Sequence, residues 1–188
     1  MSPKSIAILK EPHPCGHIVY PYTDEQRIVD AVAIFAGSGL DKGEAIVIIA
    51  TEPHCDSIKK RLHSEGFDIK RLQQTNQFIC AVAQDVLARF MREGMPEPEL
   101  FRSTVGELIE KAKQGSPDGA GRRLRFFGEM VSLLWRADVL AAARLEELWN
   151  EMIATHSVAL LCTYALDIGR HRYLPDSLMD AHSHCLDV

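Results

Sequence analysis

A change from strand-type to helix-type periodicity in the middle of the chain most constrains its fold. Residues 124–127 (Leu-Arg-Phe-Phe) form a short, largely apolar run that Gly128 ends. Glu129 then opens a segment, 130–134, in which apolar residues recur at helical spacing. A strand that passes directly into a helix is typical of α/β proteins with a parallel sheet. The pattern therefore predicts a carboxylate, Glu129, at the carboxyl end of a central strand.

Other strand-type runs alternate with helical patterns along the rest of the chain. Residues 44–50 (Glu-Ala-Ile-Val-Ile-Ile-Ala) are apolar on both faces after Glu44, which is typical of a central parallel strand. Further strands are expected at 17–22, 78–82 and 157–164. The order predicts an α/β fold, a three-layer sandwich around a mostly parallel central sheet. Prolines at positions 3, 12 and 14 favour an irregular or loosely strand-like lead-in over residues 1–15.

Length and composition limit the classes of protein to consider. A chain of 188 residues fits one domain, and the Gly/Pro-rich stretch 115–121 is short enough to be a loop. The net charge is −5, and basic residues are scattered except at 122–125, so direct nucleic-acid binding is not expected. No apolar run has membrane length, and no N-terminal signal pattern is evident. With five cysteines and no CxxC pair, we expect a reduced, cytoplasmic protein without membrane contact.

Polar side chains follow several of the expected strands. In a parallel sheet these residues meet at the carboxyl-end edge, where ligands of α/β proteins bind. The candidate ligand-binding residues are Tyr20, Tyr22, Glu52, His54, Glu129 and Tyr164. Such a group can bind a polar small molecule, hold a metal or position water. In the alternative interpretation, Glu52 and Glu129 only stabilise helix N-termini and the tyrosines are rim aromatics.

The C-terminal residues 182–185 (His-Ser-His-Cys) contain side chains of the metal-ligand type. His182, His184, Cys185 and the more distant His17 are the candidate ligands. His17 begins a strand instead of ending one, which favours a structural role for it. A structural zinc site needs four ligands, and no partner cluster is obvious. Two alternatives stay open: these residues bind a metal, or the cysteines beside histidines act in redox sensing.

Sequence motifs of several enzyme classes are absent. The chain has no GxxxxGK[ST] phosphate loop, no GxGxxG, no GxSxG elbow and no HExxH. Binding of ATP through a phosphate-cradling loop is therefore not expected.

Several segments together resemble the MEDS family, sensory domains of methanogens and methylotrophs named after the dichloromethane regulator DcmR. These segments are Gly39-Leu-x-x-Gly-Glu44, Ala50-Thr-Glu-Pro53, Gly66-Phe-Asp68, Phe-Phe-Gly-Glu-Met130, Leu145-Glu-Glu-Leu-Trp-Asn150 and Leu161-Cys-Thr-Tyr164. The resemblance covers about residues 13–185 and implies a single MEDS-like sensory domain over 1–188.

The same resemblance implies a fold similar to that of the RecA/KaiC ATPases. Residues 42–68 resemble the KaiC segment whose strand ends in the catalytic glutamate, which falls at Glu52 here. Residues 20–25 (Tyr-Pro-Tyr-Thr-Asp-Glu), however, stand where the phosphate loop needs its glycines and lysine. The resemblance thus implies a RecA/KaiC-like fold without a phosphate-binding loop.

The leading hypothesis is a cytoplasmic, non-catalytic sensory domain in signal transduction or transcriptional control. The resemblance implies hydrocarbon derivatives as ligands. It also implies a partner module: a histidine kinase, an anti-sigma-factor kinase or a transcription regulator. This module could be part of a longer version of the same polypeptide or a separate protein. A homodimer stays open. One alternative is a metal-dependent hydrolase using Glu52, His54 and Glu129, and another is a degenerate ATPase-like scaffold for protein interactions.

Overall fold

A six-stranded sheet forms the centre of the molecule. The computed structural model describes residues 1–114, 121–166 and 173–187. All six strands run parallel, in the order β3-β2-β6-β7-β1-β8. The strands are β1 (His17–Tyr22), β2 (Ala45–Ala50), β3 (Phe78–Val82), β6 (Leu124–Gly128), β7 (Val158–Ala165) and β8 (His184–Cys185). The predicted α/β class with a mostly parallel sheet is confirmed.

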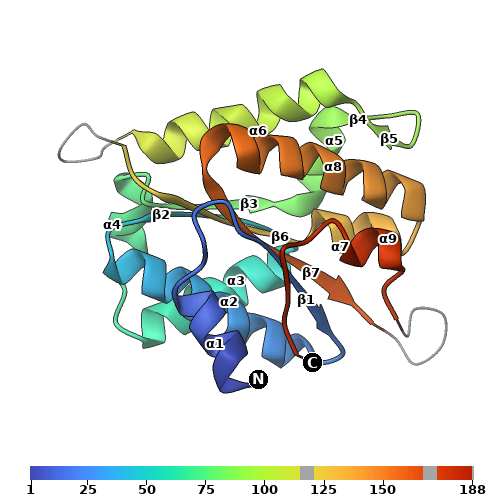
Figure 1. The fold of residues 1–188 in the computed structure, drawn as a ribbon. Helices are drawn as coiled ribbons and strands as arrows, with labels where there is room; N and C mark the ends of the chain where they lie inside the picture. Colours follow the sequence, from blue (N-terminus) through green and yellow to red (C-terminus); the bar gives the residue numbers. More distant parts are fainter. Residues whose placement is uncertain (115–120, 167–172, 188) are drawn as a thin grey trace.

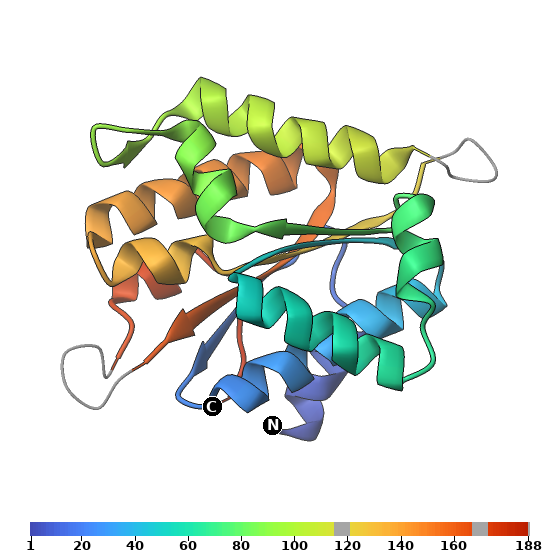
Figure 2. The same cartoon turned by 180° about the vertical axis from the view of Figure 1, so that it is seen from behind.

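Helices cover both faces of this sheet, so the molecule has three layers (Figure 1). One face carries α1 (Pro3–Lys10), α2 (Glu25–Asp41), α3 (Glu52–Ser64) and α4 (Ile69–Gln74). The other carries α5 (Ala83–Phe90), α6 (Pro98–Lys113), α7 (Met130–Trp135) and α8 (Val139–His156), and the short α9 (Asp176–Met179) contacts α8. The two helical layers are also separate when the molecule is seen from behind (Figure 2). Among the described helices, none is both long and apolar enough to cross a membrane.

The central strands are buried because both of their faces pack against helices. In β2, Ile46 and Ile48 belong to the apolar cluster under α2 and α3, whereas Val47 and Ile49 belong to the cluster under α5–α8. This alternation explains why residues 45–50 are apolar at every position. A small antiparallel hairpin, β4 (Met91–Arg92) and β5 (Met95–Pro96), lies between α5 and α6.

The expectation of an irregular lead-in over residues 1–15 was wrong for residues 3–10, which form α1. Pro3 does not prevent this helix because it stands in the first turn, where no backbone N–H is needed. The side chain of Ser2 caps the helix by accepting a hydrogen bond from the Ser5 N–H. The loop predicted at 115–121 falls, apart from Gly121, outside the described residues.

A buried arginine ties α1 and α2 to the sheet. Arg125 in β6 is 2% exposed and forms an ion pair with Glu44, which directly precedes β2. Its guanidinium also donates to the carbonyls of Leu9 at 3.1 Å and Phe35 at 2.9 Å. A Cβ atom at Gly39 would lie 2.8 Å from Arg125 Nε, so any larger residue at that point of α2 would displace the side chain of Arg125.

Candidate functional site

A cavity of about 420 Å³ opens at the carboxyl-end edge of the sheet. After β1 and β2 the chain continues into helices on one face, and after β6 it continues into α7 on the other face. Such a divergence leaves a crevice in which α/β proteins bind their ligands. We call this space the edge cavity. Its lining consists of Tyr22, Thr23, Glu25, Thr51, Pro53, His54, Gln84, Glu129, Ser132, Leu133, Arg136, Ala165 and Leu166.

A carboxylate–imidazole pair lies in the wall of the edge cavity. Glu129, 2% exposed, accepts a hydrogen bond of 2.6 Å from His54 Nδ1 in α3. Its other oxygen accepts from the backbone N–H of Thr51 at 2.8 Å and from the Thr51 hydroxyl at 3.2 Å. The pair therefore joins the end of β6 to the first turn of α3, across the point where the two helical layers diverge.

This hydrogen bond changes the acid–base properties of His54. The bond to Glu129 raises the pKa of His54 above its usual value of 6.5, and partial burial opposes this increase. Because Nδ1 donates to the carboxylate, the second ring nitrogen, Nε2, is the atom left to interact with a ligand. His54 can thus offer a hydrogen bond or a positive charge.

The remaining lining is part polar and part apolar. Burial, followed by the proximity of Glu129, raises the pKa of Tyr22 to about 12, so its hydroxyl is neutral at physiological pH. Ser132 holds the end of β7 by accepting a hydrogen bond of 3.0 Å from the Ala165 N–H. Leu133 and Leu166 contribute apolar surface. A polar group at one end of an apolar ligand would match this lining.

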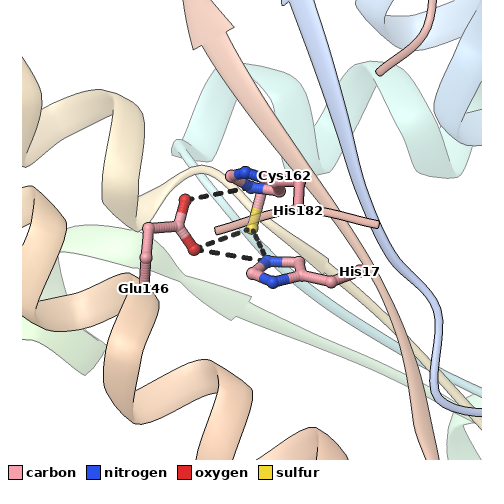
Figure 3. A group of neighbouring side chains, drawn as sticks. All are labelled: His17, Glu146, Cys162 and His182. Atoms are coloured by element: carbon pink, nitrogen blue, oxygen red, sulfur yellow. Dashed lines mark hydrogen bonds and ion pairs between the residues drawn. The ribbon is translucent and has the colours of Figure 1, made fainter. Parts of the chain in front are cut away.

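A second group of polar side chains lies deep in the protein, under α8. His17 in β1, Glu146 in α8, Cys162 in β7 and His182 beyond α9 come together there, and we call them the buried quartet (Figure 3). One ligand-type atom from each lies within 4.8 Å of the others. Burial would raise the pKa of Glu146, but the interactions with His17 and His182 outweigh this effect and lower this pKa to about 2. The buried quartet therefore contains an ionised carboxylate.

The family assignment rests on a match that covers most of the chain. The family model of the MEthanogen/methylotroph, DcmR Sensory domain (MEDS) matches residues 16–184. The chain belongs to the MEDS family. Both the edge cavity and the buried quartet lie within the matched range. No curated protein is significantly similar to this MEDS domain.

The structure brings together three of the six side chains that the sequence suggested for ligand binding in this MEDS domain. Tyr22, His54 and Glu129 all line the edge cavity. Glu52 is exposed at the start of α3 and does not belong to the lining. Tyr20 is buried against the α2 side of the sheet, and Tyr164 is buried on the opposite side, where its hydroxyl donates to Glu146.

The tail residues suggested as metal ligands separate into two environments. The side chain of His182 is fully buried in the quartet, whereas His184 and Cys185 are exposed on β8. Sequence reasoning did not identify Glu146 and Cys162 as partners of the histidines. A signal for Glu146 exists, because it is spaced with Leu145 and Trp149 on the inward side of α8, where a carboxylate is unusual.

Replacement of Glu129 by Gln should lower the pKa of His54 in this MEDS domain. The amide removes the negative charge and the ionic hydrogen bond, so burial would then dominate and favour the neutral imidazole. In the wild type, the pKa of His54 is higher in the folded state than its value of about 6.5 in the unfolded chain. The pair therefore contributes its full stabilisation of the fold below about pH 6.5. This contribution is lost as the pH rises through the folded-state pKa. An NMR titration of the His54 ring nitrogens measures the change directly.

Glu25→Gln is the matched control for this titration. Glu25 lines the same cavity and raises the pKa of His54 only through its charge, so its loss should produce a smaller decrease. An unchanged His54 titration in Glu129→Gln would show that the two side chains are not paired in solution.

Proposed function

We propose that this MEDS domain is a non-catalytic sensory domain that binds a small organic molecule in the edge cavity. The observation that carries the proposal is the His54–Glu129 pair in the cavity wall. Glu129 stands at the N-terminus of α7, yet its side chain makes no capping hydrogen bond to that helix. Both carboxylate oxygens instead hold Thr51 and His54. The carboxylate thus orients a histidine toward the cavity, which a capping role would not require.

The lining supports a ligand with one polar group on a short apolar body. The volume of about 420 Å³ lies in the lower part of the range for small-molecule sites. His54 and Tyr22 can bind the polar group, and Leu133 and Leu166 can pack against the apolar part. Hydrocarbon derivatives such as short alcohols and amines have this chemistry.

The position of the cavity supports a way to transmit the signal. His54 belongs to α3 in one helical layer, whereas Ser132 and Leu133 belong to α7 in the other. A ligand that contacts both helices would favour one relative position of the two layers. A sensor requires such a difference in affinity between two states. We propose that a kinase or transcription-regulator module in the cytoplasm detects the shift.

The proposal predicts that replacing His54 by Phe weakens ligand binding at least tenfold. The loss of a hydrogen bond to a charged group corresponds to about 1.5–3 kcal/mol. Binding is measured by ¹H–¹⁵N NMR titration with methanol and methylamine. Chemical shift changes are expected at the backbone amides of Thr51, Ser132 and Ala165.

His156→Phe is the matched control, because this imidazole ends α8 and does not line the edge cavity. It should bind each compound as the wild type does. Equal affinities of the wild type and His54→Phe would place the ligand outside the edge cavity. An absence of shift changes at the three amides with every compound would contradict the proposed ligand class.

A further inference from the structure

The buried quartet has the spacing of a metal coordination shell. His17 Nε2 lies 3.2 Å from Glu146 Oε2 and 3.3 Å from Cys162 Sγ. His182 Nε2 lies 3.2 Å from Glu146 Oε1, and Cys162 Sγ lies 3.8 Å from Glu146 Oε2. Tetrahedral zinc with its usual bond lengths separates nitrogen, oxygen and sulfur ligands by about 3.3–3.6 Å. The four ligand atoms all lie within 4.8 Å of one another, so the more distant pairs must approach each other for the side chains to surround one ion.

Hydrogen bonds outside the quartet fix the orientation of both imidazoles. His17 Nδ1 donates to the amide oxygen of Asn150 at 2.9 Å, and the Asn150 amide nitrogen donates to the Ala181 carbonyl at 3.2 Å. His182 Nδ1 donates to the Leu178 carbonyl at 2.7 Å. When a metal ion replaces the protons on Nε2, both rings would be neutral with Nδ1 protonated, and their Nε2 lone pairs would face the ion. Metal-binding histidines are typically held in this way.

One atom of the quartet lacks a hydrogen bond. His182 Nε2 is buried and lies near the Glu146 carboxylate, but it has no hydrogen-bond partner among the described residues. A buried polar atom without a partner is unfavourable. A cation placed between this nitrogen and the other three groups would satisfy it.

The charges of the donor groups also suit a divalent ion. A carboxylate and a thiolate together carry two negative charges, which a divalent ion neutralises, while the histidines bind as neutral ligands. Neutrality matters because the side chains of His17, Glu146, Cys162 and His182 are all at least 97% buried. Thiolate and imidazole donors favour Zn²⁺ over Mg²⁺ or Ca²⁺.

We propose that His17, Glu146, Cys162 and His182 form a closed zinc site. Four protein ligands leave no open position for water, so the site is structural and not catalytic. It joins β1, α8 and β7 to the segment that follows α9. Metal binding would thus hold residues 182–186, including β8, against the sheet. This inference does not depend on the ligand of the edge cavity.

The proposal predicts one zinc ion per chain in protein purified without a histidine tag. Native mass spectrometry and elemental analysis measure the stoichiometry. The affinity for Zn²⁺, measured by competition with a chelating dye, should decrease at least tenfold in Cys162→Ser and in His182→Ala. Cys55→Ser, which changes another buried cysteine, and His184→Ala, which changes an exposed neighbour, should both retain the wild-type affinity.

Cobalt substitution separates loss of a ligand from loss of the fold. The wild type with Co²⁺ should show the visible bands of tetrahedral cobalt and a sulfur-to-cobalt charge-transfer band. In Cys162→Ser, circular dichroism verifies folding, and only the charge-transfer band should disappear if cobalt still binds. Asn150→Ala keeps all four ligands and should weaken zinc binding about 10–100-fold.

Two results would overturn the proposal. One is a folded wild type that binds neither Zn²⁺ nor Co²⁺ at micromolar concentrations of the free ion. In that case, protons on the histidines hold the quartet together. The other is metal binding that Cys162→Ser and His182→Ala leave unchanged, which would place the metal elsewhere.

Discussion

Replacement of Arg125 by Met is expected to lower the free energy of unfolding by about 3–5 kcal/mol, because it leaves the Glu44 carboxylate buried without its main partner. The change also removes the donors to the carbonyls of Leu9 and Phe35. Arg123 lies 3.4 Å from Glu44 and should offset part of the loss, so we expect the lower half of this range. Urea unfolding at constant pH, followed by circular dichroism, measures the difference.

Two further variants control this experiment. Arg144 pairs with Glu147 on the surface of α8, and Arg144→Met should change the unfolding free energy by less than about 1 kcal/mol. Glu44→Met combined with Arg125→Met should be more stable than Arg125→Met alone, because no unpaired charge remains. If Arg125→Met unfolds at the urea concentration of the wild type, Arg125 and Glu44 are not a buried pair in solution.

Replacement of Trp149 by Ala is expected to lower the free energy of unfolding by about 3–5 kcal/mol. Trp149 is 1% exposed and packs edge to face against Phe101 and Phe126, with ring centroids 5.3 Å and 5.7 Å apart. Its removal would leave a cavity between α8, α6 and β6 that rigid neighbours fill only in part. Urea unfolding with a far-ultraviolet probe measures this change without the indole signal.

Leu140→Ala provides the comparison for Trp149→Ala. Leu140 lies on the same helix but is 74% exposed, so its truncation should change stability by no more than about 0.5 kcal/mol. Trp149→Phe should lie between the two, since a smaller aromatic ring still fills part of the space. Equal destabilisation by Trp149→Ala and Leu140→Ala would contradict the packing of α8 described above.

The central elements of the fold could be predicted because their sequence signals are local. Residues 45–50 are apolar at every position, and both faces of β2 are buried. The change of periodicity at Gly128 coincides with the end of β6. Three prolines in residues 1–15 favour an irregular segment over α1, but the effect of a proline depends on its position, and Pro3 stands in the first turn of the helix.

The candidate sites could likewise be predicted only where local sequence signals place their residues. Tyr22, His54 and Glu129 reach one cavity because each lies at a strand end or shortly after one, which the sequence indicates. Tyr164 also lies near a strand end, but the alternation along β7 directs its side chain into the core under α8. The buried quartet joins residues 17, 146, 162 and 182, and only the packing of α8 and the tail on the sheet brings such distant positions together.

The short strand β8 has a consequence for the solubility of the protein. It pairs with β1 at Ile18 and Val19 only. The backbone N–H groups of Ser183 and Leu186 add two hydrogen bonds to carbonyls of β1, so the tail covers this edge of the sheet. Every residue of β1 is buried, so without this cover an apolar strand edge would be open to other chains. The tail thus protects the sheet from aggregation.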